Sequence, residues 1–173
     1  MRGFINNDTM CYFNSAVQCL FNVPILTNHF LRDPYTGKCM FTSLYQILLK
    51  QYWTADKTPI NLDGLHFAFQ KEFPRFRSDE QHDVQETVLC IIDILERSQP
   101  IVKEWLYGKK MQETIWPGGK TMNEEDFSIH LLNYKGDPDM SKMIKDSTDW
   151  NVLENFQDNN GTTYNAATTR MLF

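Results

Sequence analysis

Apolar residues recur at helical spacing along the first part of the chain. In residues 11–21 they fall every three or four positions and cover most sides of a helix, and Pro24 blocks its continuation. A second amphipathic stretch covers residues 41–53, and the Asp, Pro and Gly residues of segment 33–37 are typical of a turn. The pattern therefore predicts two helices with a loop between them.

Two more helices are predicted before residue 100. A weaker pattern covers residues 62–73 and stops before Pro74. The clearest pattern follows Asp83 and keeps the helical period over residues 84–95, and Glu86, three residues after Asp83, completes a capping signature. The first hundred residues are therefore expected to be mainly α-helical.

The pattern changes in the last part of the chain. Residues 116–119, Trp-Pro-Gly-Gly, mark a turn, and apolar and polar residues alternate over 127–131 as in a half-buried strand. The tail, residues 162–173, is rich in β-forming residues and ends on an apolar run, as in a strand that is cut off. This part is expected to be rich in β-strands.

Composition and charge exclude several classes of protein. Hydrophobic residues make up 42% and charged residues 23% of the chain, as in an ordinary globular domain. The formal net charge is −5 and no basic run occurs, so neither nucleic acid nor an anionic membrane is an expected partner. The longest wholly apolar run, residues 88–92, is far shorter than the roughly 18 residues of a membrane span. We expect a soluble protein inside the cell.

The cysteines show no metal-binding pattern. There are four of them, Cys11, Cys19, Cys39 and Cys90, and no two form a C-x-x-C motif. This spacing favours neither a zinc ribbon nor a disulfide framework. We therefore expect reduced thiols, and neither a metal nor another cofactor.

Cys11 stands at the start of the first predicted helix. A helix N-terminus directs unpaired N–H groups and the positive end of the helix dipole at a thiolate, which is the nucleophilic form of cysteine. The polar residues 6–10 precede it, and their amide side chains could donate to an oxyanion formed at an attacked carbonyl. The alternative is that Cys11 is an ordinary buried small hydrophobe and that the Asn-rich stretch only caps a helix.

The residues around Cys11 form a longer motif. Residues 3–21 read GFINNDTMCYFNSAVQCLF. The segment resembles the cysteine box of ubiquitin-specific proteases, G-L-x-N-x-G-N-T-C-Y-x-N-S followed by x-x-Q-x-L. Nine specified positions match, one of them, Phe4 for Leu, less strictly: Gly3, Phe4, Asn6, Cys11, Tyr12, Asn14, Ser15, Gln18 and Leu20.

This resemblance assigns roles to two residues. It implies that Cys11 is the nucleophile and that Asn6 is the side-chain donor of the oxyanion hole. The sequence departs from the family just before the cysteine, where Asp8-Thr9-Met10 replaces G-N-T. A glycine there permits close approach of a substrate, whereas an aspartate adds negative charge that disfavours the thiolate.

A second motif opens the fourth predicted helix. Residues 81–86 read QHDVQE, and an apolar helical pattern follows. They resemble the acidic box Q-Q-D-A-x-E-F-L of the same family, and the His and Val variants are most similar to its herpesvirus-associated member. The resemblance implies that Asp83 and Glu86, with Gln81 as a weaker contact, bind the arginine-bearing C-terminal tail of ubiquitin. Helix capping is the plainer role of these carboxylates, and the two roles are compatible.

The resemblance also implies a fold. It predicts an α+β, papain-like cysteine protease with a mainly helical thumb over residues 1–100, followed over 101–173 by the β-rich start of the fingers. The palm half is expected to be absent, which leaves one incomplete catalytic domain. Many relatives hold zinc between paired cysteines in the fingers, but no cysteine follows Cys90 here, so no such metal is expected.

A cysteine protease also needs a general base, normally a histidine. In the family this histidine lies downstream of both motifs, in a Gly-His-Tyr context that this sequence lacks. The four histidines are therefore expected in other roles: His29 in the loop after Pro24, His66 on an amphipathic helix, His82 at a helix start and His130 on the polar side of a strand.

The motifs together favour a thiol-dependent deubiquitinase that hydrolyses the bond after the C-terminal glycine of ubiquitin. Its partners would be ubiquitin and ubiquitinated proteins, in the cytoplasm or the nucleus. A catalytically inactive ubiquitin-binding pseudoenzyme is the alternative, favoured by segment 8–10 and by the missing histidine. A helical interaction domain with no ubiquitin role is a third reading, which two motifs in order make improbable.

Overall fold

A computed structural model describes residues 2–7, 9–78, 80–134, 136 and 138–173 of the chain. The chain divides into two compact units, Met1–Leu106 and Tyr107–Phe173. The first is called the helical unit and the second the sheet unit. No helix within the described ranges is long and apolar enough to cross a membrane.

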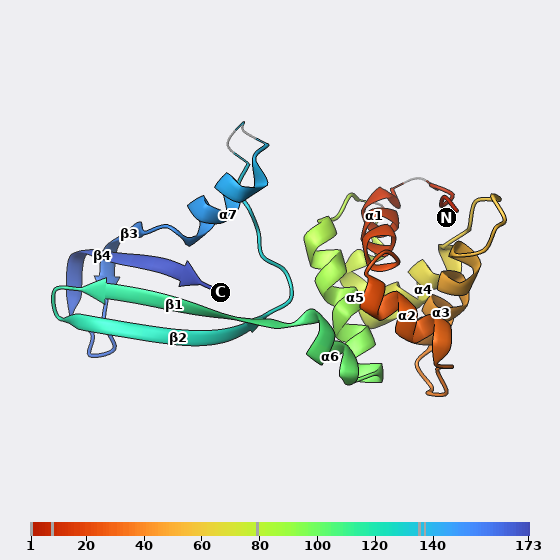
Figure 1. Ribbon diagram of the computed structural model, residues 1–173, viewed down its shortest axis with the longest axis horizontal. Helices are drawn as coiled ribbons and strands as arrows, with labels where there is room; N and C mark the ends of the chain where they lie inside the picture. Colours follow the sequence, from red (N-terminus) through yellow and green to blue (C-terminus); the bar gives the residue numbers. More distant parts are fainter. Residues whose placement is uncertain (1, 8, 79, 135, 137) are drawn as a thin grey trace. The chain divides into compact units, whose positions relative to one another are not determined.

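Six α-helices and one 3₁₀ helix are described in the helical unit (Figure 1). They are α1 Cys11–Leu20, α2 Pro24–Arg32, α3 Met40–Tyr52, α4 Asp63–Glu72, η1 Pro74–Arg77, α5 Val84–Ser98 and α6 Ile101–Leu106. The four predicted helices are confirmed as α1, α3, α4 and α5. Helices α2 and α6 were not predicted, and α6 lies beyond the predicted boundary at residue 100.

Pro24 explains why α2 was missed. The sequence pattern uses it as the end of the first helix, but Pro24 is the first residue of the next one, where its fixed φ and its missing N–H are both tolerated. The prediction that His29 lies in a loop is therefore wrong. His29 stands in the last turn of α2.

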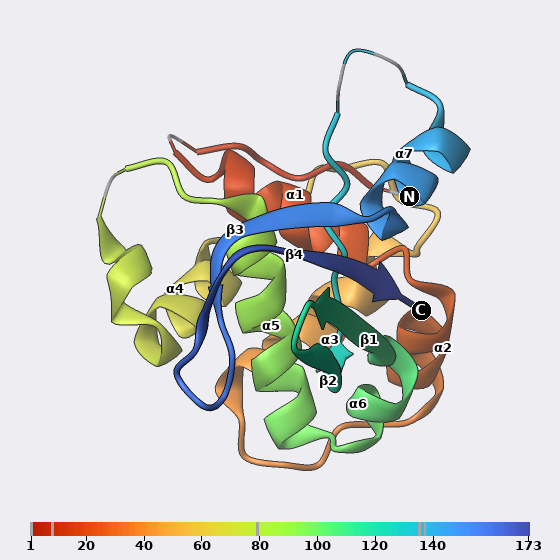
Figure 2. The same ribbon diagram turned by 90° about the vertical axis from the view of Figure 1, so that its left-hand side faces the viewer.

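The core of the helical unit is built from the apolar faces of these helices. Its largest fully buried side chains include eight aromatic rings: Tyr45, Tyr52, Phe13, Phe21, Phe30, Phe41, Phe69 and Phe76. Helix α1 packs against α5, and the N-terminal ends of the two helices lie side by side at one end of the unit (Figures 1 and 2). Side chains at both helix starts can therefore serve one site.

The segment before α1 is held by backbone pairing. Phe4 forms a parallel bridge with Ile60, in which Ile5 N donates to Ile60 O at 2.9 Å and Ile60 N donates to Gly3 O at 2.9 Å. The Phe4 ring lies 5.9 Å from the ring of Phe21. These contacts fix the backbone directly before Asn6.

The sheet unit contains a four-stranded antiparallel sheet with strand order β2-β1-β4-β3. The strands are β1 Gly108–Trp116, β2 Gly119–Phe127, β3 Asn151–Gln157 and β4 Thr163–Leu172, and helix α7 Met140–Thr148 precedes β3. The predicted turn at 116–119 is confirmed, because Trp116 pairs with Gly119 across the hairpin. The β-rich tail is confirmed as β4.

The strand predicted over 127–131 is wrong. Phe127 pairs with Gly108, the first residue of β1, so residues after Phe127 have no partner on that strand. His130 consequently lies outside any strand. The alternation of apolar and polar residues is a local signal, whereas a strand also needs a neighbour to pair with.

Candidate active site

Cys11 is the first residue of α1, and its side chain is exposed. The N-cap residue, Met10, gives no side-chain hydrogen bond to the helix start. Unpaired N–H groups at a helix N-terminus are therefore directed toward an exposed sulfur. The alternative that Cys11 is a buried small hydrophobe is therefore wrong, and among the described residues of the Asn-rich stretch no side chain caps α1.

Asn6 lies beside this helix start and is exposed. The side-chain amide of Asn14, on α1, donates to Asn6 Oδ1 and to the backbone oxygen of Ile5, both at 3.2 Å. Asp8 lies outside the described residues. Met10, the last residue of the segment 8–10 that departs from the motif, is 7% exposed. Its carbonyl accepts from Asn14 N at 2.9 Å, as in a regular first helical turn.

An open, polar hollow of about 640 Å³ adjoins the start of α1. It is lined by Asn6, Asn7, Thr9, Met10, Asp63, His66 and Gln70. Asn7 Nδ2 donates to both carboxylate oxygens of Asp63, at 3.2 and 3.3 Å, which ties the segment before α1 to α4. A group entering this hollow would reach the side chain of Asn6, which lies five residues before Cys11 in the motif.

Tyr12, next to Cys11, is bonded to a histidine. Its hydroxyl lies 2.8 Å from His66 Nε2. Burial raises the pKa of Tyr12 to about 12, with the nearby Cys11 adding to the effect. Burial lowers the pKa of His66, while the charge of Asp63 opposes the shift and His82 reinforces it. Tyr12 therefore stays protonated and donates its hydrogen to a neutral His66 at neutral pH.

Each of the four histidines has a polar partner other than Cys11 in the described part of the chain. His29 Nδ1 lies 3.2 Å from a carboxylate oxygen of Asp33, and His82 Nε2 lies 3.3 Å from Ser78 Oγ. His66 Nε2 bonds the hydroxyl of Tyr12, and His130 Nε2 lies 3.0 Å from Ser147 Oγ. No hydrogen bond among the described residues joins Cys11 Sγ to a histidine nitrogen, and a general base from these four stays unassigned.

The acidic motif stands at the start of α5. Asp83 is its N-cap, and Asp83 Oδ1 accepts from Glu86 N at 3.1 Å, so the predicted capping role is confirmed. Glu86 Oε1 forms an ion pair with Arg75 Nε at 2.8 Å. Gln81, Asp83 and Glu86 are all exposed. Both carboxylates are thus accessible to a partner, although Glu86 is already paired with the guanidinium of Arg75.

Arg75 was not singled out from the sequence. It follows Pro74 in η1, and its Nη2 lies 3.0 Å from Cys90 Sγ on α5. Its guanidinium lies over the ring of Phe76, 5.1 Å from the centroid. Nothing in the local pattern pointed to this pairing, because Arg75 and Glu86 meet only through the packing of η1 against α5.

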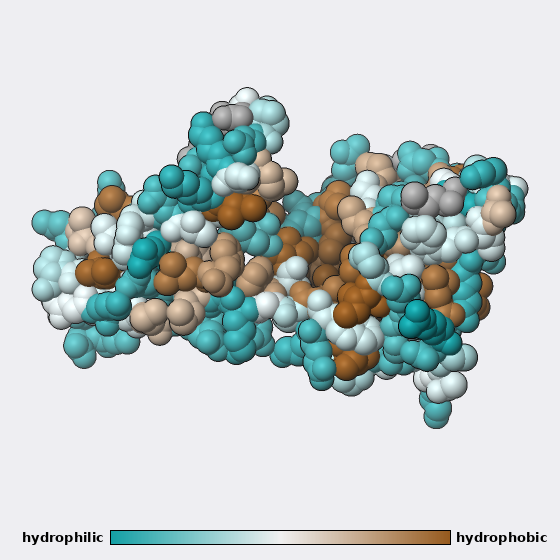
Figure 3. All heavy atoms as spheres, viewed as in Figure 1, coloured by the Kyte–Doolittle hydropathy of each residue, from teal (hydrophilic) through white to brown (hydrophobic). Residues whose placement is uncertain are grey.

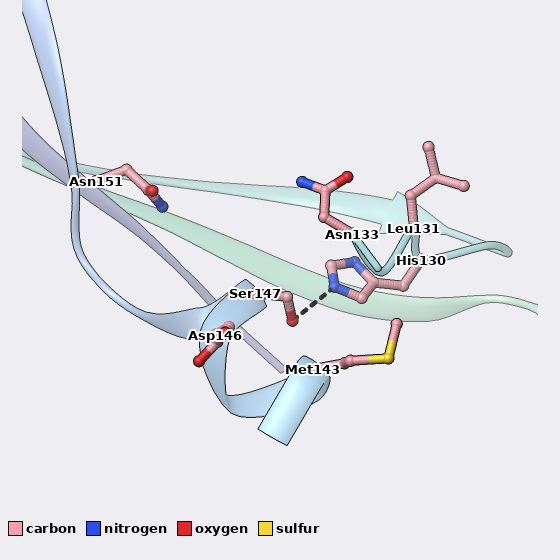
Figure 4. Close-up of a pocket in the computed structure, with 7 residues that line it drawn as sticks. All are labelled: His130, Leu131, Asn133, Met143, Asp146, Ser147 and Asn151. Atoms are coloured by element: carbon pink, nitrogen blue, oxygen red, sulfur yellow. Dashed lines mark hydrogen bonds between the residues drawn. The ribbon is translucent and has the colours of Figure 1, made fainter. Parts of the chain in front are cut away.

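The sheet unit has a separate pocket of about 190 Å³, which combines a histidine, a serine and an aspartate (Figure 4). His130 Nε2 lies 3.0 Å from Ser147 Oγ. The Ser147 hydroxyl donates to the backbone oxygen of Ile144 at 2.7 Å, so it accepts from His130. A serine nucleophile would have to donate to the histidine instead, and this pocket therefore does not have the arrangement of a serine hydrolase.

Comparison with known proteins gives consistent matches. A family model described as ubiquitin carboxyl-terminal hydrolase matches residues 2–158. Ubiquitin carboxyl-terminal hydrolase 15 of Homo sapiens is 27% identical over 139 residues, and ubiquitin carboxyl-terminal hydrolase cyk-3 of Caenorhabditis elegans is 32% identical over 107 residues. The matches cover 75% and 56% of this chain but 14% and 9% of those proteins.

A solved structure of similar fold is that of the SAGA DUB module with Ubp8, Sgf11, Sus1 and Sgf73, bound to ubiquitin aldehyde. The match has a TM-score of 0.76 at 16% identity and covers 99% of this chain and 44% of the matched chain. At this identity the likeness shows the fold, and it confirms the predicted α+β class.

Proposed function

Because this chain belongs to the ubiquitin carboxyl-terminal hydrolase family, we propose that it is part of a thiol-dependent deubiquitinase, with Cys11 as the nucleophile. This is the family to which the two sequence motifs pointed. The observation that carries the proposal is the exposed Cys11 at a helix start that lies side by side with the start of α5, where Asp83 and Glu86 are exposed.

The proposed reaction is acyl transfer through Cys11. Its thiolate attacks the carbonyl carbon of the C-terminal glycine of ubiquitin, and a sulfur–carbon bond replaces the bond to the leaving amine, which departs with a proton. Asn6 donates to the oxyanion of the tetrahedral intermediate. Water then cleaves the thioester, which returns the thiol and releases the carboxylate. The thiol proton requires a base, and we propose that a histidine outside these 173 residues supplies it.

We propose that the ubiquitin tail approaches along the start of α5. Asp83 and Glu86 are carboxylates that can each accept charge-assisted hydrogen bonds from an arginine, and Gln81 adds a weaker polar contact. In this arrangement the helical unit corresponds to the thumb of the family fold and the sheet unit to the start of the fingers. The neighbour of similar fold is bound to ubiquitin aldehyde, which supports ubiquitin as the partner.

A ubiquitin probe with a C-terminal electrophile tests the proposal. We expect one covalent adduct, located at Cys11 by peptide mass spectrometry and abolished by Cys11→Ala. Cys19→Ala is the matched control, because Cys19 is also an exposed cysteine of α1 but lies in its last turn. Labelling at Cys19, or equal labelling of unfolded protein, would contradict the assignment of Cys11.

A ubiquitin-binding protein without catalysis is the second candidate. It is favoured by the polar contacts of the four histidines, because none of those among the described residues joins a histidine to Cys11. This candidate predicts saturable ubiquitin binding, lost in the double variant Asp83→Asn/Glu86→Gln, with no adduct at Cys11. Absence of both binding and labelling would contradict both candidates.

A further inference from the structure

An asparagine can act as an oxyanion donor only in one of two orientations. The two ends of its side-chain amide are alike in shape, but the nitrogen donates hydrogen bonds and the oxygen only accepts them. If the side-chain oxygen of Asn6 faced the oxyanion, the two oxygens would repel each other. The chemistry at Cys11 therefore depends on what selects the orientation of Asn6.

The hydrogen bonds around Asn14 select one orientation. The carbonyl oxygen of Ile5 can only accept, so the Asn14 atom 3.2 Å from it must be the nitrogen. The same nitrogen lies 3.2 Å from the side-chain amide of Asn6, so the Asn6 atom facing it must be the oxygen. Asn6 Nδ2 then points away from Asn14, and no hydrogen bond of the described residues engages it.

The position of Asn14 ties this selection to the nucleophile. Asn14 lies three residues after Cys11 on α1, so the two share the same helical face and turn. The carbonyl of Ile5 is itself fixed, since Ile5 N donates to Ile60 O. One rigid framework therefore places the sulfur and the amide that would face the attacked carbonyl.

The other end of Asn14 indicates what this arrangement costs. Asn14 Oδ1 is buried, and no described residue gives it a hydrogen bond. Turning the amide over would place this oxygen against the backbone oxygen of Ile5, which can only accept. Within the described residues this buried oxygen is left without a donor, while the nitrogen of the same amide holds Asn6.

We propose that Asn14 is a positioning residue, which holds Asn6 Oδ1 so that Asn6 Nδ2 faces the oxyanion formed at Cys11. The inference rests on the proposed function and adds a residue to it. Asn14 itself touches neither the substrate nor the reacting atoms. Its substitution should therefore weaken binding of a tetrahedral adduct without weakening binding of ubiquitin.

Asn14→Asp should reverse the orientation of the Asn6 amide, while the side chain at position 14 keeps nearly the same shape. A carboxylate accepts but does not donate, so Asn6 would turn its nitrogen toward residue 14 and its oxygen toward the oxyanion. Ubiquitin aldehyde gives a suitable readout, because the Cys11 thiol adds across its carbonyl. A sulfur–carbon bond forms, the carbonyl oxygen takes the negative charge or the thiol proton, and no base for a leaving group is needed.

We expect Asn14→Asp to weaken binding of ubiquitin aldehyde about 100-fold, comparable to the loss of one oxyanion donor. Binding of ordinary ubiquitin should change less than about twofold. Asn14→Ala, which removes the selection without reversing it, should have an intermediate effect. Asn14→Ala also takes the place of Asn14→Asp as the test variant if Asn14→Asp shows no cooperative unfolding transition.

Added charge near Cys11 needs its own control. In an Asn6→Ala background, Asn14→Asp should cause little further loss, because the residue it positions is gone. A further tenfold loss there would show that the charge acts directly, and the inference would be overturned. Asn22→Asp makes the same chemical change at an exposed asparagine just after α1, whose amide donates to Gln18 O, and aldehyde affinity should be retained.

One readout does not depend on ubiquitin. The side-chain amide signals of Asn14 in a nitrogen–proton NMR spectrum should shift when Asn6→Ala removes their acceptor. If they do not shift, the positioning contact does not exist, whatever ubiquitin does. If they shift but Asn6→Ala leaves aldehyde affinity unchanged, the role proposed for Asn6 fails and this inference fails with it. A chain that shows the shift but does not bind ubiquitin would contradict the proposed function and leave Asn14 a structural residue.

Discussion

At the scale of single residues, the site depends on contacts that occupy functional groups before any partner arrives. Glu86, proposed to bind an arginine of the ubiquitin tail, is already paired with Arg75, and Arg75 also contacts Cys90. Both side chains of the pair are about half exposed. An exposed ion pair contributes at most about 1 kcal/mol, so an incoming guanidinium can exchange with Arg75.

This pairing gives a prediction for Arg75. We expect Arg75→Ala to tighten binding of ubiquitin about two- to fivefold, because Glu86 no longer has to release an internal partner. Isothermal titration calorimetry measures the effect. Arg77→Ala is the matched control, since Arg77 lies in the same short helix and donates to Gln70 O instead. Weaker binding in Arg75→Ala would instead mean that Arg75 supports Glu86 in the bound state.

The contact between Tyr12 and His66 predicts a dependence of stability on pH. Folding lowers the pKa of His66 from 6.5. As the pH falls from 6.5 toward the pKa of the folded state, the unfolded chain therefore binds more protons than the folded chain. The free energy of unfolding should therefore decrease over this window and be unaffected by His66 above it. Denaturant titrations at pH 7.5 and 5.5 measure this loss.

The matched variant for this experiment is His66→Gln, which keeps an acceptor for Tyr12 but does not titrate. It should show a smaller loss of stability between the two pH values than the unmodified chain. His29→Gln is the control, because His29 pairs with Asp33, the residue that follows α2, and not with Tyr12. An equal loss in His66→Gln would rule out His66 as the source.

At the scale of the elements, the start of α5 combines a structural and a proposed functional role in one side chain. Asp83 caps the helix through the backbone N–H of Glu86, and Thr87 N and Oγ1 both donate to the backbone oxygen of Asp83. An asparagine caps a helix about as well as an aspartate but carries no charge. The two roles can therefore be separated by substitution.

We expect Asp83→Asn to leave the free energy of unfolding within about 0.5 kcal/mol and to weaken ubiquitin binding roughly tenfold, because a charge-assisted contact is lost. Asp83→Ala should lose the same affinity and also about 1 kcal/mol of stability. Chemical denaturation and calorimetry measure the two quantities. Asp139→Asn, the same change at the N-cap of α7, should not alter ubiquitin binding. Unchanged affinity in Asp83→Asn would restrict Asp83 to capping.

At the scale of the whole molecule, the two units are stabilised in different ways. The helical unit buries a large aromatic core, whereas the buried residues described in the sheet unit are Glu113, Thr114, Ala167 and Thr169. Figure 3 shows the surface of the sheet unit as a mixture of hydrophilic and hydrophobic residues. Hydrophobic burial therefore contributes much less per residue to the sheet unit.

Ion pairs across strands compensate in part. Glu113 on β1 is 6% exposed at its side chain and pairs with Lys120 on β2 and Arg170 on β4, each at 2.6 Å. The hydrogen bonds from Lys120 and then Arg170 lower the pKa of Glu113. These pairs connect three of the four strands. These ion pairs nevertheless stabilise the sheet less than a packed apolar face would.

This contrast predicts unequal protection from hydrogen exchange. Amides of β1–β4 should exchange at least about tenfold faster than those of α1 and α5, since local opening costs less where few apolar groups are buried. Hydrogen–deuterium exchange with mass spectrometry measures it. A chain limited to residues 1–106 should keep a cooperative helical unfolding transition. Equal protection of both units, or loss of that transition, would contradict the assignment of stability to the helical core.

Much of the helical unit and the residues proposed for the site follow from the sequence alone. Helical periodicity and the Asp83 cap depend on residues within four positions of one another, so the pattern predicted α1, α3, α4 and α5 directly. The two motifs are also local, and they led to the family and to Cys11. Local signals failed where a partner strand was needed, at 127–131, and where Pro24 served the next helix instead of the previous one.

Only the tertiary structure decided how the site residues are held. The orientation of Asn6 depends on Asn14, eight residues away, and the partner of Glu86 is Arg75, eleven residues away in another element. The bond between Tyr12 and His66 joins residues 54 positions apart. Such contacts are set by how helices pack, which no local pattern specifies. The sequence determined that Cys11 stands at a helix start, and packing decided that its side chain is exposed and that this helix start lies beside that of α5.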